Sequence, residues 1–368
     1  MKRLLAAAAA VLLCLNILPV AHGIDTSAGS AILMEAESGR VLYEQEADRP
    51  RLIASVTKLM TALVALESGH PLEELVTVEE EDTRTEGSSL YLKPGERLRL
   101  ETLLYGLLLQ SGNDAALAVA RHCGGTVDNF VGQMNRRAAR LGMTNSCFAN
   151  PSGLNAEGHC STARDLAILA QACLKNKTLA AIAATRSVTL EGRSFVNHNK
   201  LLWRYEGCVG LKTGYTERAG RTLVSAAERE GMTLIAVTLD DPNDWRDHVA
   251  LFDWGFSHWK METVVRTGEE ICSLPVGGSL VPFCPIQAGA DLRWPLREGE
   301  RLELRLDLPL EQLTAPVQKG VRIGTLRGVV GDKQAGEIPL VCGETVPRDL
   351  EEPRTGIFRR LLCWLEKF

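Results

Sequence analysis

Ser55 and Lys58 lie three residues apart in the stretch ASVTKLMTAL, residues 54–63, directly before an apolar run with helical spacing. A serine hydroxyl is a poor nucleophile and needs a base, and a lysine amine serves as one only when it is uncharged. One helical turn brings both side chains onto the same face. The stretch is therefore either an ordinary helix start capped by Ser55 or a nucleophile beside its base. The serine cap is expected in both cases, because it places Ser55 at the electropositive end of the helix.

The Ser-x-x-Lys pattern alone does not decide between these readings, because it recurs at Ser257 and Lys260. Two further motifs follow Ser55 in order. SGN occupies residues 111–113, 56 positions on (111 − 55), and KTG occupies residues 212–214, another 101 positions on (212 − 111). Each motif is weak by itself, since turns are rich in Ser, Gly and Asn. The three in this order indicate an acyl-transfer site.

The three motifs resemble the active-site set of penicillin-binding proteins and serine β-lactamases, most closely that of low-molecular-mass D-alanyl-D-alanine carboxypeptidases. The stretches LLLQSGNDAA, NPSGL, GLKTGYT and DWGF add to the resemblance, which covers nearly the whole chain. It implies removal of the terminal D-alanine from peptidoglycan pentapeptides through an acyl-enzyme on Ser55. It also implies inhibition by β-lactam antibiotics and no need for a metal or organic cofactor.

The resemblance implies catalytic roles for three polar side chains and places Asn113 among the substrate-binding residues. Ser55 carries the acyl group, Lys58 is its base, and Ser111 relays a proton to the leaving amine. Asn113 either holds the peptide carbonyl of the substrate or orients Lys58. Burial and the nearby cation of Lys212 are both expected to lower the pKa of Lys58.

The resemblance also implies a substrate-binding role for the KTG segment. Lys212 and Thr213 are expected on an edge strand, where they contact the substrate carboxylate. Backbone N–H groups of Ser55 and Tyr215 form the expected oxyanion hole. Arg246, shortly before DWGF, is a further candidate for the carboxylate, because a planar guanidinium suits it. The candidate site residues are thus Ser55, Lys58, Ser111, Asn113, Lys212, Thr213, Gly214, Tyr215 and Arg246.

Three alternative functions stay open at this stage. A class A β-lactamase needs a glutamate roughly 35 residues after Ser-x-Asn. That region reads NSCFANPSGLN and holds no carboxylate; Glu157 follows in a Gly-rich loop. A DD-endopeptidase performs the same acyl transfer on cross-linked peptides. A non-catalytic cell-wall binding protein is the third alternative, although every proposed catalytic residue is present.

The elements that must position these residues indicate two domains. Strands within residues 31–45 and after residue 208 enclose helices that begin at Ser55 and near residues 101–110, 126–141 and 162–175. This order predicts an α+β domain over residues 24–262, with an antiparallel sheet flanked by helices as in β-lactamases and transpeptidases. Short alternating runs over residues 263–348 predict a small all-β domain.

The two ends of the chain predict its location. Residues 1–23 have a basic start, an apolar run and a small-residue cleavage site, which is typical of a secretory signal peptide. Residues 349–368 read as a linker and an amphipathic helix too short to cross a bilayer. We therefore expect an exported protein held on the extracytoplasmic face of the cell membrane.

The net charge, the cysteines and the histidines give little further information on partners, disulfides or metal sites. The formal net charge of −5 gives no reason to expect nucleic acid as a partner. Nine of the ten cysteines follow the signal peptide, an odd number with no CxxC, and no bridge is predicted. None of the seven histidines falls in a metal-like spacing, so they are expected to be structural or on the surface.

Overall fold

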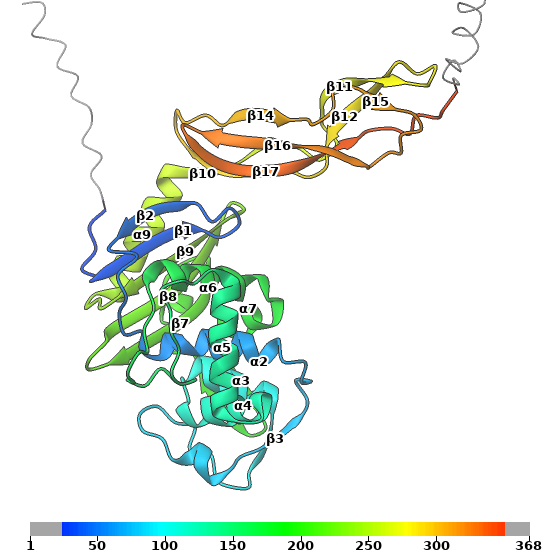
Figure 1. Ribbon diagram of the computed structural model, residues 1–368. Coiled ribbons are helices and arrows are strands. Elements are labelled where there is room, and N and C mark those ends of the chain that lie inside the picture. Colours follow the sequence, from blue (N-terminus) through cyan, green and yellow to red (C-terminus); the bar gives the residue numbers. More distant parts are fainter. Residues whose placement is uncertain (1–23, 350–368) are drawn as a thin grey trace, which may run out of the picture.

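The computed structural model describes residues 24–349, which form a part with both helices and strands and a part built from strands (Figure 1). The first part is an α+β domain that contains a five-stranded antiparallel sheet with the strand order β2, β1, β9, β8, β7. Its strands are β1 (Ser30–Glu35), β2 (Val41–Gln45), β7 (Cys208–Thr216), β8 (Gly220–Arg229) and β9 (Met232–Leu239). The predicted pair of strands near the N-terminus is thus present as β1 and β2.

Helices separate the first two strands from the last three. They are α2 (Lys58–Leu66), α3 (Leu100–Leu109), α4 (Asn113–Gly124), α5 (Val127–Leu141), α6 (Ala163–Lys175), α7 (Lys177–Ala184), α8 (Leu201–Arg204) and, after β9, α9 (Asp244–His258). Two 3₁₀ turns, η1 (Ala54–Thr57) and η2 (Glu80–Thr83), and two small ribbons complete this part. The ribbons pair β3 (Leu75–Thr77) with β4 (Arg97–Arg99) and β5 (Ser187–Leu190) with β6 (Arg193–Val196).

The middle of the sheet is buried on both faces, because β1, β8 and β9 carry apolar or small residues at most positions. On β9, Ile235 and Val237 pack into the large core formed with the helices between β2 and β7. Leu234 and Ala236 point to the opposite face, where they pack with Phe252 of α9. The result is a three-layer arrangement, with α9 on the second face (Figure 1), where the short helix α8 packs into the same core.

The strand-built part confirms the predicted all-β domain. A six-stranded sheet has the order β14, β16, β17, β12, β11, β15, and β10 pairs with β13. The strands are β10 (Trp259–Val265), β11 (Glu270–Gly277), β12 (Phe283–Ala288), β13 (Leu292–Arg297), β14 (Glu303–Asp307), β15 (Leu313–Thr314), β16 (Arg322–Val330) and β17 (Lys333–Cys342). The predicted boundary between residues 262 and 263 falls within β10.

The signal-peptide and tail-helix predictions concern residues 1–23 and 350–368, which lie outside the described residues. Between residues 24 and 349, no single helix is long and apolar enough to cross a membrane. Only α6 and α7 taken together reach the necessary length and hydropathy, and they are bent by 102°.

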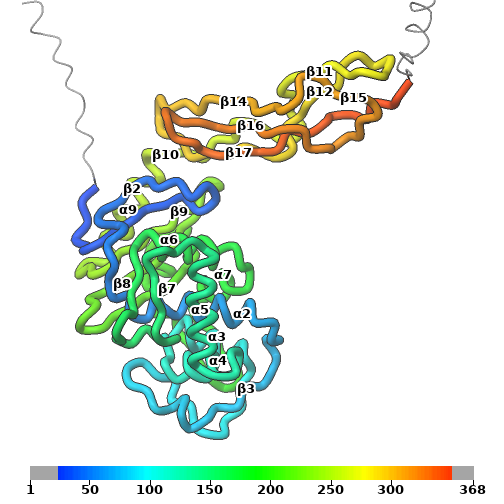
Figure 2. Tube along the Cα trace, in the orientation of Figure 1, coloured from blue at the N-terminus to red at the C-terminus, as the bar shows by residue number. Residues whose placement is uncertain are grey.

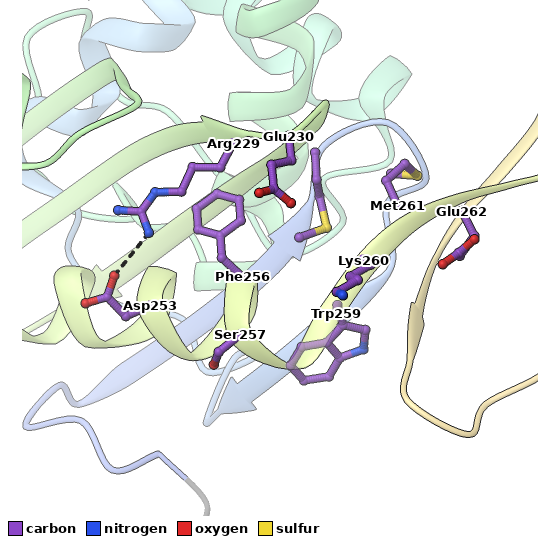
Figure 3. A pocket seen from close by; sticks show the side chains of 10 residues that line it. Arg229, Glu230, Asp253, Phe256, Ser257, Trp259, Lys260, Met261 and Glu262 are labelled. Atoms are coloured by element: carbon purple, nitrogen blue, oxygen red, sulfur yellow. Dashed lines mark hydrogen bonds and ion pairs between the residues drawn. The ribbon is translucent and has the colours of Figure 1, made fainter.

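The chain passes between the two parts through α9 and β10 (Figure 2). A cavity of about 440 Å³ lies there, and the second Ser-x-x-Lys pattern, Ser257 and Lys260, lines it (Figure 3). The Ser257 hydroxyl donates to the carbonyl of Trp254 at 3.0 Å, and the Lys260 side chain is exposed. This pair therefore lies away from the other two motifs, as the order of the motifs predicted.

Candidate active site

The three motifs meet at one cavity although they are far apart in the sequence. η1 carries Ser55 and contacts β7, which carries the KTG segment. Ser111 lies in the turn between α3 and α4. The cavity has a volume of about 280 Å³ and is lined by Ser55, Ser88, Ser111, His198, Lys200, Thr213, Gly214, Tyr215, Arg221, Asp244 and Trp245. The order of the motifs in the sequence thus predicted a shared site in space.

The start of the helix differs from the predicted serine cap. Ser55 lies inside η1, and the α-helix proper begins at Lys58. Neither η1 nor α2 has a side-chain cap, whereas a capping serine accepts a bond from the backbone N–H two or three residues on. Ser55 Oγ instead lies 3.0 Å from Lys58 Nζ. The serine is therefore engaged with the lysine, and the capping prediction was wrong.

Lys58 is fully buried and has three hydrogen-bond partners. Its Nζ lies 3.0 Å from Ser55 Oγ, 2.7 Å from Asn113 Oδ1 and 2.6 Å from the carbonyl oxygen of Ser152. Burial, and next the cation of Lys212, lower the pKa of Lys58 well below its ordinary value. The predicted direction of this pKa shift is thus confirmed.

The partners of Lys58 also orient its lone pair. A neutral amine has two N–H donors and one lone pair. The amide oxygen of Asn113 and the carbonyl of Ser152 can only accept, so they take the two donors. The lone pair then faces Ser55 Oγ, ready to accept its proton.

The amide of Asn113 is fixed in the orientation that this requires. Its Nδ2 donates to the carbonyl of Glu86 at 2.6 Å, which turns Oδ1 toward Lys58. Asn113 was expected either to hold the peptide carbonyl of the substrate or to orient Lys58, and the geometry matches the second role.

The NPSGL turn supplies a contact that sequence reasoning missed. Asn150 Oδ1 accepts hydrogen bonds from the backbone N–H groups of Ser152 (3.2 Å) and Gly153 (2.7 Å). Gly153 has φ +88°, and a Cβ there would lie 1.9 Å from the carbonyl oxygen of Ala54. Glycine is required at this position, and the tight turn aims the Ser152 carbonyl at Lys58. The sequence contained the motif, but no residue pattern gives the direction of a backbone carbonyl.

Ser111 has two unusual features in a single residue. Its φ is +64°, in the left-handed region that non-glycine residues avoid. Its Oγ is buried and has no hydrogen-bond partner within residues 24–349. Since Ser111 lines the cavity, its hydroxyl is available to a bound molecule.

Lys212 and Thr213 lie on β7 at the edge of the sheet, as predicted. Burial lowers the pKa of Lys212 to about 7, and its Nζ donates to the carbonyl of Thr213 at 2.8 Å. A Cβ at Gly214 would lie 2.9 Å from the backbone nitrogen of Ser55, so glycine lets β7 approach the nucleophile closely. Tyr215 follows with an exposed side chain that lines the cavity.

Arg221, and not the predicted Arg246, is the arginine that lines the cavity. Arg221 extends from β8 and pairs with Asp244 at 3.1 Å. The Arg246 side chain is 69% exposed and pairs with its neighbour Asp247 at 3.0 Å, outside the cavity lining. Sequence reasoning missed Arg221 because the pairing of β7 with β8, rather than any motif, brings it to the cavity.

The D-alanyl-D-alanine carboxypeptidase family, Peptidase_S11, matches residues 19–243. The chain belongs to this family. The C-terminal domain of penicillin-binding protein 5 matches residues 259–348. Family membership confirms the predicted enzyme class, a serine peptidase that is also a penicillin-binding protein, and favours none of the three alternatives.

Full-length relatives support this membership. D-alanyl-D-alanine carboxypeptidase DacF of Bacillus subtilis is 32% identical over 87% of this chain and 86% of its own length. DacA of Escherichia coli K12 is 34% identical over 90% of this chain and 87% of its own. The crystal structure of penicillin-binding protein 5 from Haemophilus influenzae, 28% identical, covers 88% of this chain and 99% of its own with a TM-score of 0.77. The predicted fold class is thus confirmed for both domains.

Proposed function

We propose that this protein releases the terminal D-alanine from peptidoglycan pentapeptides through an acyl-enzyme on Ser55. The observation that carries the proposal is the set of contacts around Lys58. Two acceptors take the N–H groups of its neutral amine, so its lone pair faces the hydroxyl of Ser55. This arrangement makes Lys58 the general base and Ser55 the nucleophile.

The reaction proceeds by two acyl transfers. Ser55 Oγ bonds to the carbonyl carbon of the penultimate D-alanine while its proton passes to Lys58 Nζ. The C–N bond to the terminal D-alanine then breaks, and a proton reaches the leaving amine through the unpartnered hydroxyl of Ser111. Backbone N–H groups of Ser55 and Tyr215 stabilise the oxyanion. Water then attacks the ester, which releases the shortened peptide and restores Ser55.

Basic side chains around the cavity give it the charge needed for a terminal carboxylate. Lys200 and Arg221 line it, beside Thr213, whose hydroxyl can donate to the same group. Lys212 precedes Thr213 on the same edge strand, and its side chain is buried. We assign the carboxylate to Thr213, Lys212 and Arg221, with Arg246 in no direct role. A β-lactam carries a carboxylate and a reactive amide in a similar relation, so it would acylate Ser55 and block the site.

We also propose a location for the enzyme, from the sequence of its two ends. Residues 1–23 would direct export, and residues 349–368 would hold the mature chain on the outer face of the cytoplasmic membrane. Deletion of residues 350–368 is expected to move the protein from the membrane fraction to the soluble fraction while D-alanine release persists. Retention of the shortened chain in the membrane fraction would contradict this anchoring role.

The function is tested by incubating the purified chain with a pentapeptide that ends in D-Ala-D-Ala and measuring free D-alanine. Mass spectrometry after penicillin treatment should place the adduct on Ser55. Ser55→Ala should abolish both signals, and Ser257→Ala, in the second Ser-x-x-Lys, should abolish neither. A protein that labels with penicillin but releases no D-alanine would refute the carboxypeptidase activity.

A further inference from the structure

Three side chains with no part in the proposed reaction converge at the last turn of α4. His122 belongs to that turn, and His70 and Glu74 lie in the segment between α2 and β3. One ligand atom from each residue lies within 4.8 Å of the other two. The two imidazole rings are tilted by 52°, with their centroids 4.8 Å apart.

One carboxylate is shared between the two imidazoles. His70 Nδ1 lies 2.9 Å from Glu74 Oε2, and His122 Nε2 lies 3.3 Å from Glu74 Oε1. The second contact is not an aligned hydrogen bond, and His122 Nε2 is a buried atom with no hydrogen-bond partner among the described residues. An unpartnered buried nitrogen costs about 1–3 kcal/mol. A cation between the three groups would give that nitrogen a partner.

We propose that His70, Glu74 and His122 bind a divalent cation of the zinc type. Two imidazole nitrogens and one carboxylate oxygen are a donor set that Zn²⁺ accepts, with water as a fourth ligand. Tetrahedral zinc at bond lengths of about 2.1 Å places its donors roughly 3.4 Å apart. His70 lies 2.9 Å from one oxygen of Glu74 and His122 lies 3.3 Å from the other. A set with one ligand atom from each residue lies within 4.8 Å, so its donors would approach one another by up to about 1.4 Å on binding.

The surroundings do not oppose a cation. Arg121 is adjacent in sequence to His122, but its guanidinium pairs with Asp82 at 2.6 Å and donates to the carbonyl of Thr77 at 2.7 Å. The last turn of a helix carries a partial negative charge, which favours a cation at this end of α4. The three ligand side chains are each between 18% and 36% exposed, so water can occupy the fourth position.

The cation would act as a structural clamp. It would join the segment after α2 to the end of α4, and these two helices begin at Lys58 and Asn113 respectively. His122 is nine residues after Asn113 on α4 (122 − 113), so the cluster lies about 14 Å from Asn113 along the helix axis. Binding should therefore raise the melting temperature and leave the chemistry at Ser55 unchanged.

The test uses the full chain without a polyhistidine tag, stripped of metal with a chelator and titrated with Zn²⁺ by calorimetry. We expect one Zn²⁺ per chain and a higher melting temperature on binding. His70→Gln and His122→Gln should each weaken binding by more than about 100-fold, since loss of an outer-shell partner alone costs 10–100-fold. Glu74→Gln should weaken it less, because its amide oxygen remains a possible ligand.

Two matched controls locate the site. His258→Gln removes an exposed histidine elsewhere, and Cys123→Ser removes the thiol next in sequence to His122. Both should keep one Zn²⁺ per chain. Penicillin labelling of Ser55 verifies that every variant is folded, so failure of the labelling assay and failure of metal binding are distinguishable. The proposal is overturned if the wild type binds no Zn²⁺ saturably, or if binding survives in both histidine variants.

Discussion

Burial and the cation of a second lysine lower the pKa of the lysine that is proposed as the base. Lys212 contributes by its charge, which opposes protonation of Lys58. At the scale of single residues, the site therefore depends on two amines that are buried together, and each should have a measurable effect on pH dependence.

The first prediction concerns the acylation rate. In Lys212→Met the cation near Lys58 is gone, so the pKa of Lys58 rises. A base must lose its proton before it can act, and the acid limb of the penicillin acylation rate should shift to higher pH. Stopped-flow measurement of the acylation rate across a range of pH gives the pH at which this acid limb falls, and the wild type is the control. A limb that stays in place or moves to lower pH would show that Lys212 does not tune Lys58.

A second prediction concerns stability. The pKa of Lys212 falls to about 7 in the folded chain from 10.5, so between these values the unfolded chain binds more protons. Stability from this group therefore rises with pH over that window and is lowest below pH 7. Lys212→Met should stabilise the protein by about 4 kcal/mol at pH 7 and by about 1 kcal/mol or less at pH 10. Urea denaturation at both pH values measures the difference; an equal effect at the two pH values would contradict it.

At the scale of elements, the site depends on a turn packed under η1. A Cβ at Gly153 would overlap the carbonyl of Ala54, directly before the nucleophile. Gly158 has a similar φ of +75°, but nothing lies within 4 Å of its Cβ position. The two glycines therefore separate the cost of backbone conformation from the cost of overlap.

We expect Gly153→Ala to destabilise the protein by about 3 kcal/mol or more, from the overlap and the left-handed backbone together, and to slow acylation at Ser55. Gly158→Ala should cost only about 1 kcal/mol, the price of a left-handed alanine, and leave acylation unchanged. Thermal denaturation and penicillin labelling measure the two effects. Equal losses in the two variants would mean that the contact with Ala54 is not what requires glycine.

Most helices and most residues of the candidate site could be predicted from the sequence, because each depends on a short local pattern. The helices expected near residues 101–110, 126–141 and 162–175 are α3, α5 and α6 within a residue or two. Ser55, Ser111 and Thr213 were found because each belongs to a short motif. The direction of the Ser152 carbonyl depends on the geometry of its turn, and the position of Arg221 depends on the pairing of β7 with β8. No sequence motif specifies either of them.

The His70, Glu74 and His122 cluster was missed for the same reason. His70 and Glu74 are close in sequence, but the third group comes 48 residues later (122 − 74) from another element. Metal-ligand spacing in a sequence finds only the ligands that one element supplies. The packing of α4 against the segment after α2 brings in the third.

At the scale of the whole molecule, ion pairs join the turn between β1 and β2 to β13 and the residues after it. Arg40 and Glu300 form two parallel hydrogen bonds, of 2.8 Å and 2.6 Å, with both side chains largely buried. Arg293 pairs with Glu37 at 2.8 Å. These contacts connect the two domains beside the covalent link through α9 and β10.

A double-mutant cycle with Arg40→Gln and Glu300→Gln should give a coupling energy of about 1 kcal/mol, since bidentate and partly buried pairs exceed the usual surface value. Chemical denaturation measures it. The more exposed pair Arg293 and Glu37 serves as the comparison and should couple more weakly. D-alanine release should stay at the wild-type rate in all variants. Additive effects of the two substitutions would show that the pair does not hold the domains together.

The left-handed conformation of Ser111 and its unpartnered hydroxyl have a consequence for how this protein can change under selection. Both features oppose folding, by about 1 kcal/mol or more each. Ser111→Ala should stabilise the chain and Ser111→Gly should stabilise it further, while both lose D-alanine release. A library of variants screened for heat resistance alone would therefore be enriched in Ser111→Gly, which is more stable but has lost D-alanine release. Activity and durability compete at this single residue.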